Sequence, residues 1–389
     1  MKNDIRQERI HAVWRYLNGE KPEAICASLR RSKAWLYKWI ERYDENDNSW
    51  SESHSRRPLT SADRTPQEVE EIVKLVRHNL YKENLFCGAQ AIRWELADLG
   101  VTPLPSMRTI NRILNRNGLT LRRTGKYEPK GTPYPTLPSL LPNQTHQADL
   151  VGPCYLKGPV RFYGLNTIDL STARCGLHPS ETKAGQDILN GFWAIWKRMG
   201  VPERIQIDNA MYFFGSLRYP RGMGPLIRLC LHMGIEPWFI PLAEPWRNGV
   251  IEQFNNHYQQ KFLAKTNMVT MDDLKRGTLD FEQRHNTRYR YSKLKGRTPL
   301  KTLAMTKAKL CFPQEEALPR CCQEKPEVGR YHLVRLIRSD LRLTICGEHF
   351  SVAPELMYEY VVATIDVKDQ KLKLFLGKTQ VDELNYQLR

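Results

Sequence analysis

The sequence predicts a multidomain chain with two α-helical domains, an α/β core and a small C-terminal β-barrel. The core is predicted to be a mixed five-stranded sheet with helices on both faces. Three observations support this. Helical periodicity and helix caps occupy the first 118 residues. Short apolar runs then alternate with helical segments up to residue 263. From residue 328, apolar and polar residues alternate between turn residues, as in short antiparallel strands.

The composition indicates a polyanionic partner. The 389 residues include 59 Lys and Arg against 42 Asp and Glu, a formal net charge of +17. The basic residues are spread over every segment, which favours nucleic acid over a membrane surface. A merely basic soluble protein is the alternative. No apolar run is long enough to span a bilayer, and we expect no membrane partner. The nine cysteines lack zinc-site spacing and no signal peptide precedes them, so we expect a cytoplasmic protein.

Residues 1–50 are predicted to form an N-terminal helix-turn-helix domain. The first helix has an apolar stripe of Ile10, Val13, Trp14 and Leu17. Ser32 is suited to cap the third helix. In this motif the last helix enters the major groove of DNA. A helical packing module is the alternative. The outward residues predicted to contact DNA are Lys33, Tyr37, Lys38 and Arg42.

Residues 64–118 are predicted to form a second helix-turn-helix domain. Pro66 is expected to open its first helix and Ser106 to cap its last. Its predicted DNA contacts are Arg108, Asn111, Arg112 and Arg116. Residues 44–63 have the composition of a linker, and residues 119–142 are a basic, proline-rich linker. Linker residues predicted to contact the phosphate backbone are Arg56, Arg57, Arg122, Arg123 and Lys126.

Three acidic residues occupy the most informative positions of the core. Asp149 and Asp208 each close an apolar run of strand type, and Glu252 lies one turn into a helix. The predicted strands are 145–151, 162–170, 174–178, 204–208 and 235–240, and the predicted helices are 183–199, 225–233 and 247–263. If the strands pair and the last helix packs across them, the three carboxylates converge. Oxygen ligands of this kind suit two hard cations, which in-line phosphoryl transfer uses.

Four motifs carry a resemblance to a known family. They are His146-Gln147-Ala148-Asp149, Asp208-Asn209 before an aromatic stretch, Pro245-Trp246-Arg247-Asn248-Gly249-Val250-Ile251-Glu252, and His285-Asn286-Thr287-Arg288-Tyr289 leading to Gly296-Arg297-Thr298-Pro299. Over residues 143–303 the chain resembles the integrase-core transposases of bacterial insertion sequences, within the superfamily of DDE transposases and retroviral integrases. The resemblance implies a ribonuclease-H-like core.

The resemblance also implies a mechanism and partners. Asp149 would bridge two Mg²⁺ ions, Asp208 would bind one and Glu252 the other, with Mn²⁺ able to substitute. Water would first nick DNA to free a 3′-hydroxyl, which would then join target DNA. The expected partners are double-stranded DNA, both element ends and target, and further copies of the chain as a dimer or larger assembly. The expected location is the bacterial cytoplasm, at the nucleoid.

The sequence departs from the family pattern in two places. Ala210 stands where the family usually has Gly, and the interval from Asp208 to Glu252 is longer than usual, which we attribute to a loop at 215–224. The acids also have structural interpretations: a strand-end acid, an Asp-Asn turn and an exposed helix acid. Asp169 is expected to be structural. Further predicted DNA contacts are Arg247, Asn248, Asn256 and Gln259.

Residues 326–389 are predicted to form a small barrel that resembles the SH3-like barrel following the core in many family members. Its role could be DNA contact, contact with a second subunit, or neither. Two alternatives to a transposase stay open. One is a DNA-binding regulator with a catalytically idle core, and the other is a metal-dependent nuclease without strand transfer.

Overall fold

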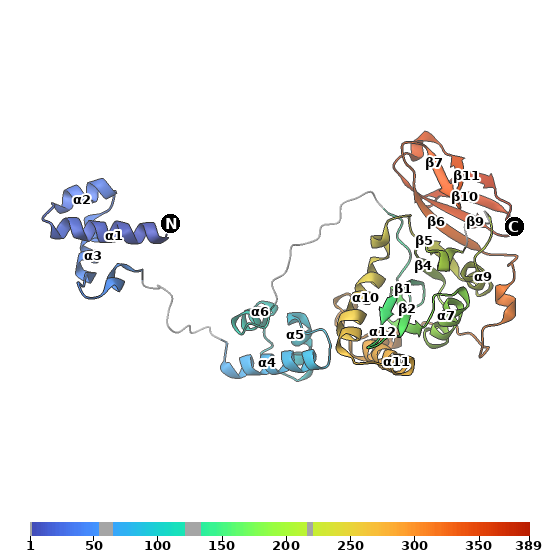
Figure 1. The fold of residues 1–389 in the computed structure, drawn as a ribbon, viewed down its shortest axis with the longest axis horizontal. Coiled ribbons are helices and arrows are strands. Elements are labelled where there is room, and N and C mark those ends of the chain that lie inside the picture. The colour runs from blue at the N-terminus through green and yellow to red at the C-terminus, as the bar shows by residue number, and fades with distance from the viewer. Residues whose placement is uncertain (1, 54–64, 121–133, 216–220) are drawn as a thin grey trace. The chain divides into compact units, whose positions relative to one another are not determined.

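The structure is a computed structural model that describes residues 2–53, 65–120, 134–215 and 221–389 (Figure 1). Contacts divide the chain into two compact units, Met1–Pro66 and Gln67–Arg389. The linker residues predicted to contact DNA, namely Arg56, Arg57, Arg122, Arg123 and Lys126, lie outside the described residues.

The first unit contains three helices, α1 (Lys2–Leu17), α2 (Pro22–Leu29) and α3 (Lys33–Arg42), followed by a 3₁₀ turn, Asn48–Ser51. Ser32 caps α3 as predicted, because its hydroxyl accepts a hydrogen bond from the Trp35 amide (3.2 Å). The predicted apolar stripe of α1 is correct only in part. Val13 is buried and Ile10 is half-buried, but Trp14 and Leu17 are 66% and 52% exposed, and Ala12 is buried beside Val13. The buried face is therefore displaced from the stripe of largest apolar residues.

The second unit begins with α4 (Gln67–Lys82), α5 (Ala89–Asp98) and α6 (Met107–Arg116). Their shared core continues into the helices that follow the strands of the core sheet. The Tyr289 hydroxyl donates to the Asn84 carbonyl (2.7 Å), and Arg290 pairs with Asp98 (2.6 Å). Gly296 has φ +80°, and a Cβ there would lie 2.6 Å from the Trp94 ring. Only glycine therefore allows this close approach between the helical domain and the core.

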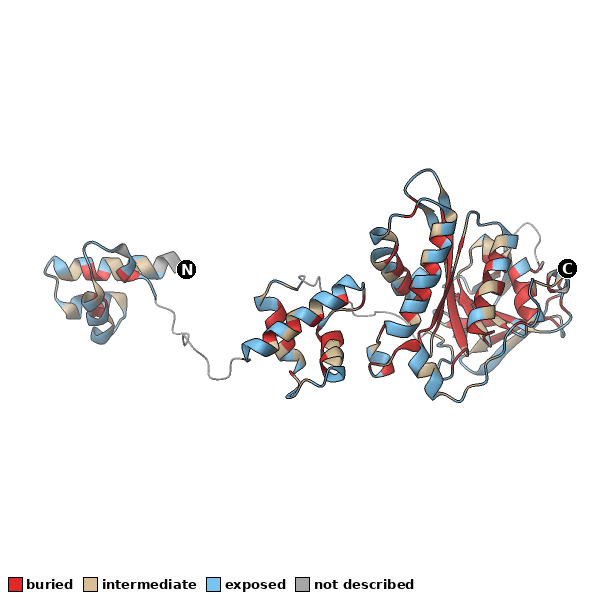
Figure 2. Ribbon diagram, turned by 90° about the horizontal axis from the view of Figure 1, so that it is seen from below, coloured by how far each residue is buried: buried red, intermediate tan, exposed pale blue. Residues whose placement is uncertain are grey.

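The centre of the second unit is a mixed sheet with helices on both faces. The strands of the predicted core are β1 (Thr145–Tyr155), β2 (Arg161–Asp169), β3 (Cys175–Ser180), β4 (Arg204–Ile207) and β5 (Glu236–Phe239). The β1–β2 and β2–β3 pairs are antiparallel, and β4 is parallel to both β1 and β5. Figure 2 shows buried residues along the strands, between the helices. The mixed core sheet is as predicted.

The helices divide between two hydrophobic cores. α7 (Gly185–Met199), α8 (Met211–Phe214) and α9 (Pro225–His232) pack in one core. α10 (Gly249–Lys261) and α11 (Met271–Arg288) pack in the other, and α12 (Pro299–Met305) contacts α11. Residues 162–169 of β2 are buried throughout, and they include the polar side chains of Asn166, Thr167 and Asp169.

The predicted separate C-terminal barrel is not confirmed. β6 (Arg330–Leu336) pairs in parallel with β5 and antiparallel with β9 (Tyr360–Asp366), and β10 (Lys371–Leu376) and β11 (Thr379–Asn385) follow. The sheet therefore has nine strands in the order β11-β10-β9-β6-β5-β4-β1-β2-β3. β7 (Arg342–Ile345) and β8 (Glu348–Ser351) form a separate hairpin. The C-terminal strands thus extend the core sheet, and β6 pairs with backbone groups of β5 that would otherwise be at the sheet edge.

Candidate active site

Asp149 lies on β1, between β4 and β2, and opposite Asn166 of β2. Its carboxylate is half-buried and accepts two hydrogen bonds. The Leu150 amide donates to Oδ1 (2.8 Å), and the Asn255 side chain on α10 donates to Oδ2 (2.7 Å). These contacts fix the carboxylate between the sheet and the helix that covers it.

Asp208 follows β4 directly, and Glu252 lies in the first turn of α10. Gln147 of β1 pairs with Gln206 of β4, so Asp149 and Asp208 are each two residues beyond a shared register position. Side chains two residues apart on a strand face the same side of the sheet. Oδ1 of Asp208 accepts a hydrogen bond from the Ala210 amide (3.0 Å). Ala210 thus serves as the turn donor at the position where the family usually has Gly.

The three acids interact electrostatically. The pKa of Asp149 is raised to about 6, mainly by burial and then by the carboxylates of Asp208 and, more weakly, Glu252, against the opposing hydrogen bonds. Burial also raises the pKa of Asp208. Two like charges close to Asp149 disfavour its ionised form, so a positive charge placed among the three carboxylates would relieve the repulsion.

The chemistry of these donors fits a hard divalent cation, because all three are carboxylates and two are partly desolvated. Their arrangement is more open than a complete ligand set. Within the described parts of the chain, no three His, Cys, Asp or Glu side chains are gathered closely enough to hold a metal ion. Mutual repulsion of the carboxylates opposes closer approach without a cation.

Asn255 is a site residue that the sequence interpretation missed. It is buried, donates to Asp149, and accepts a hydrogen bond from the Asn166 side chain (2.8 Å). The signal was present, since Asn255 lies three residues after Glu252 and adjoins it on the helix surface. The interpretation used the position four residues on, Asn256, which is exposed.

Three side-chain amides attach the start of α10 to the strands that carry the aspartates. Asn248 is buried and donates to the Ala148 carbonyl (3.0 Å). The Gln147 side chain accepts from the Ile251 amide (3.1 Å), and the Gln206 side chain donates to the Arg247 carbonyl (2.8 Å). Asp169 is also buried, and it accepts hydrogen bonds from the Ser171 and Thr172 amides, as expected for a structural acid.

The predicted DNA contacts differ in how far they are exposed. Lys33, Tyr37 and Lys38 on α3 are exposed, while Arg42 is half-buried against Trp39. On α6 the predicted set Arg108, Asn111, Arg112 and Arg116 is exposed throughout, and Asn256 and Gln259 are exposed on α10.

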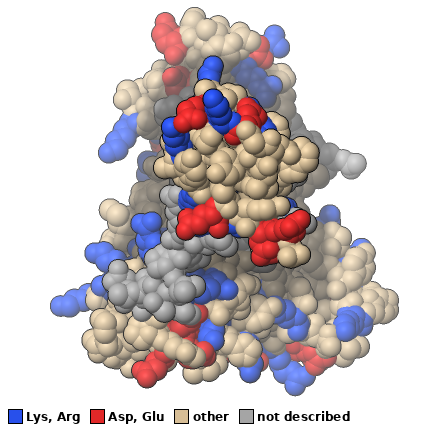
Figure 3. Space-filling model, turned by 90° about the vertical axis from the view of Figure 1, so that its left-hand side faces the viewer, with Lys and Arg blue, Asp and Glu red and all other residues tan. Residues whose placement is uncertain are grey.

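Some of these side chains already have partners inside the protein. Asn248 is buried, and the Arg247 guanidinium is held by Glu244 (2.9 Å). Lys33 pairs with Glu23 (2.6 Å), and Arg116 pairs with Glu70 (3.3 Å). In the view of Figure 3, basic and acidic side chains are interspersed and no single basic patch dominates.

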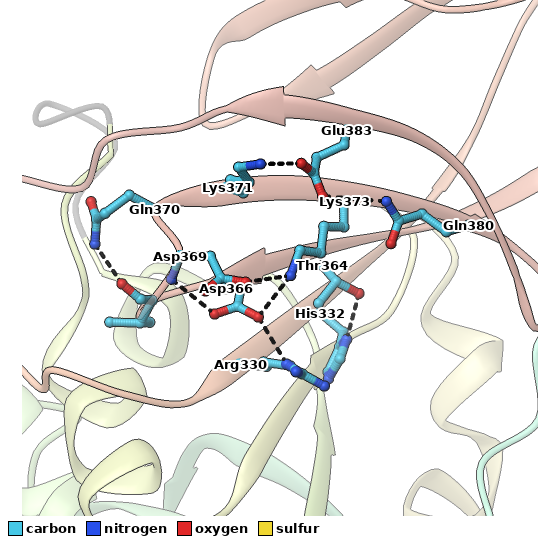
Figure 4. Close-up of polar contacts among 11 residues, drawn as sticks. Arg330, His332, Thr364, Asp366, Asp369, Gln370, Lys371, Lys373, Gln380 and Glu383 are labelled. Carbon is cyan, nitrogen blue, oxygen red and sulfur yellow. Dashed lines mark hydrogen bonds and ion pairs between the residues drawn. The ribbon is translucent and has the colours of Figure 1, made fainter.

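A cavity of about 390 Å³ lies on the C-terminal strands and contains none of the three acids. Its lining residues are Trp238, Arg330, His332, Val362, Thr364, Lys373, Phe375, Gly377 and Gln380. Figure 4 shows that Arg330 and Lys373 both point to Asp366, at 3.0 and 3.2 Å. Lys373 also pairs with Asp369 (2.6 Å), so the two cations face two carboxylates and the cavity has no strong preference for an anion. Within the described residues, no helix has the length and apolarity needed to cross a membrane.

Two domain families match the chain. The homeodomain-like domain matches residues 6–49, and the integrase core domain matches residues 233–299. The second match includes Glu252 and two of the four sequence motifs, those at 245–252 and 285–299, while Asp149 and Asp208 lie outside it.

Solved retroviral integrase structures show weak similarity. The HTLV-2 integrase catalytic core domain in complex with magnesium (trimeric form) is 16% identical, with a TM-score of 0.33, covering 42% of this chain and 99% of that chain. A simian T-cell lymphotropic virus intasome in complex with PP2A regulatory subunit B56 gamma is 13% identical, with a TM-score of 0.38. The match covers 82% of this chain and 97% of that chain. The catalytic core domain of BIV integrase is 12% identical, with a TM-score of 0.33, covering 42% and 94%. Such scores are too low to support a conclusion about chemistry.

The two family matches support a DNA-binding and DNA-integration type of function, with the integrase core belonging to the polynucleotidyl transferases. The resemblance drawn from the sequence is confirmed at this level. The chain carries a homeodomain-like domain followed by an integrase core domain, as integrase-core transposases do.

Proposed function

We propose that this protein is an insertion-sequence transposase that nicks the ends of its element and joins them to target DNA. The residues proposed to carry the chemistry are Asp149, Asp208 and Glu252. Mg²⁺ is the proposed cofactor, as two ions with Mn²⁺ as a substitute. The observation that supports the proposal most is the hydrogen bond from Asn255 of α10 to Asp149, together with the pairing of β1 with β4, the strand that Asp208 follows. Glu252 lies on the same helix, three residues before Asn255.

Bound divalent cations would supply charge stabilisation for the attacking and leaving oxygens of a phosphodiester. The chain's own residues supply the ligands and their orientation. Asp149 has its carboxylate fixed by Asn255 and by the Leu150 amide. Asp208 is fixed by the turn at Ala210. Asn248 anchors the helix that carries Glu252 to β1.

The proposed reaction consists of two in-line displacements at phosphorus. In the first, the oxygen of water attacks, the bond to the 3′-oxygen breaks, and a 3′-hydroxyl and a 5′-phosphate result. In the second, the 3′-hydroxyl oxygen attacks a phosphodiester of target DNA and releases a new 3′-hydroxyl. One phosphodiester is made for each one broken, so joining needs no external energy source.

The proposed partners are the terminal inverted repeats, bound by the helical domains, and target DNA. Exposed basic residues on α3 and α6 support this assignment. Because two element ends must be held together for joining, we propose a dimer or a larger assembly.

The test is metal-dependent nicking of a duplex carrying the element end, which is identified by sequencing the flanks of the coding region for inverted repeats. We expect nicking with Mg²⁺ and none with Asp149→Asn, while end binding is retained. A pre-nicked end with a free 3′-hydroxyl should give joined product, which separates a transposase from a metal nuclease. Unchanged nicking by Asp149→Asn would overturn the proposal.

The second candidate is a DNA-binding regulator with an idle core. The observation that favours it is that the described residues do not gather three metal-binding side chains. A regulator would bind the end duplex, and Mg²⁺ would neither stabilise the protein nor cause nicking.

A further inference from the structure

We propose that the C-terminal strands are part of the candidate active site, with Arg335 and Tyr360 as positioning residues for the segments that carry Asp208 and Glu252. The inference rests on the proposed function, because these segments matter for catalysis only if the acids hold a metal. It assigns a role to the region that the sequence suggested was a separate barrel.

The continuous sheet is the first observation. β6 pairs with β5 at Trp238↔His332 and Phe239↔Leu333. β5 leads directly into the segment that contains the 3₁₀ turn Pro245–Asn248 and then α10 with Glu252. β6 therefore lies next to the strand from which the chain continues to Glu252. A tethered barrel would have no fixed position there.

Arg335 makes the contact to the Asp208 side. It is only 8% exposed, and its Nη2 donates to Oδ1 of Asn209 (3.1 Å), the residue after Asp208. Asn209 in turn donates to the Ile240 carbonyl at the end of β5 (2.5 Å). Other guanidinium nitrogens donate to the Val334 and Thr344 carbonyls. A planar guanidinium with several fixed acceptors has little freedom to move, so it holds Asn209 firmly.

Tyr360 of β9 makes the contact to the Glu252 side. Its hydroxyl donates to the Glu244 carboxylate (2.8 Å) and accepts from Nη2 of Arg247 (2.9 Å). Arg247 also donates to Glu244 (2.9 Å), and its guanidinium lies 4.9 Å from the centre of the Tyr360 ring. The Arg247 guanidinium also lies 4.2 Å from the centre of the Tyr134 ring. The cluster fixes the turn immediately before α10.

Arg335 and Tyr360 each hold a segment of the chain that adjoins one of the candidate acids. The Arg247 carbonyl is already held by Gln206 of β4, so the turn before α10 is fixed both from the strand of Asp208 and from β9. Residues that orient metal ligands without touching the metal typically change metal affinity or activity by about 10–100-fold when they are replaced. The same kind of effect is expected here, and it differs from simple loss of stability.

The test uses the full-length chain with Tyr360→Phe, which keeps the ring and removes the hydroxyl, and with Arg335→Met. Two quantities are measured: the Mg²⁺ concentration for half-maximal nicking of the end duplex, and the rise in melting temperature caused by Mg²⁺ without DNA. We expect each variant to need about tenfold more Mg²⁺ and to show a smaller rise in melting temperature at a fixed Mg²⁺ concentration. Saturating Mg²⁺ should restore much of the nicking.

The matched controls are Tyr358→Phe, at an exposed tyrosine, and Arg330→Met, at an arginine of the same strand whose partner is Asp366. Both controls should keep the wild-type Mg²⁺ dependence.

Wild-type Mg²⁺ dependence in Tyr360→Phe overturns the inference. If Arg335→Met does not fold, the result for Tyr360→Phe alone is the test. A wild-type chain that Mg²⁺ stabilises but that does not nick contradicts the transposase activity alone, since the melting shifts still test the positioning role. If Mg²⁺ affects neither quantity in the wild type, the proposed function fails and the inference with it.

Discussion

The side-chain amide of Asn255 donates a hydrogen bond to Oδ2 of Asp149 across 2.7 Å, joining the helix that carries Glu252 to strand β1. The same side chain accepts from Asn166, so one buried amide links β1, β2 and α10. A buried amide with both ends bonded allows little movement of the carboxylate it contacts.

Replacing Asn255 should therefore damage both stability and catalysis. In Asn255→Ala, Asp149 loses a donor and the buried Asn166 amide loses its acceptor. We expect the free energy of unfolding to fall by about 1–3 kcal/mol, measured by urea denaturation, and Mg²⁺-dependent nicking to be lost. Asn256→Ala, at the exposed neighbour, is the control for stability and should change it by less than about 0.5 kcal/mol. Equal effects of the two substitutions would contradict the assigned role of Asn255.

Asp149 should make the metal-free protein less stable as pH rises. Its pKa is raised to about 6 from an ordinary value of 3.8, so the folded state binds this proton more tightly than the unfolded state. The free energy of unfolding therefore falls as pH rises from about 4 to about 6. In EDTA at neutral pH, Asp149→Asn should be more stable than wild type by about 1–3 kcal/mol, and the difference should vanish below about pH 4.

Asp169→Asn is the contrasting variant for that measurement. Asp169 accepts hydrogen bonds from the backbone amides of its own turn, so replacement of its carboxylate should lower stability at neutral pH. Thermal melts across pH in EDTA compare the two variants. A loss of stability at neutral pH in Asp149→Asn would show that its ionised form is not disfavoured in the folded protein.

The exposed face of α6 should contribute to DNA affinity without contributing to folding. Arg112→Ala removes an exposed cation. It should reduce the slope of the logarithm of the end-duplex binding constant against the logarithm of salt concentration by about one, measured by fluorescence anisotropy at several salt concentrations. The melting temperature should stay the same. Lys301→Ala, an exposed lysine on α12, is the control. The same loss in both variants would point to unspecific charge effects.

Removing the C-terminal strands should unfold the catalytic core. A chain ending at residue 325 leaves the edge of β5 unpaired and exposes the apolar residues that β6 and β9 share with α7 and α9. We expect loss of the cooperative thermal transition in circular dichroism. A truncated chain that melts as sharply as the full chain would instead indicate an independent C-terminal domain.

Local patterns in the sequence were sufficient for most elements. Caps at Ser32 and Ser106 and the apolar runs of β1, β2 and β4 depend on neighbouring residues alone, and the structure has them as predicted. The strands β8 and β11 were not predicted, because their exposed and half-exposed residues carry little apolar alternation. The predicted burial of Trp14 is wrong because the size of an apolar side chain does not determine which face of a helix packs against other helices.

The sequence by itself determined the N-terminal helices, the strands and helices of residues 145–263 and the three candidate acids, since each depends on residues close together in the chain. It did not predict the long helix α11. Only the tertiary structure decided that β6 pairs with β5 and that Asn255, Arg335 and Tyr360 reach the segments around those acids. The physical reason is that an alternating strand pattern specifies which face is buried but not which distant strand supplies the hydrogen bonds. Contacts between residues far apart in sequence follow from that pairing.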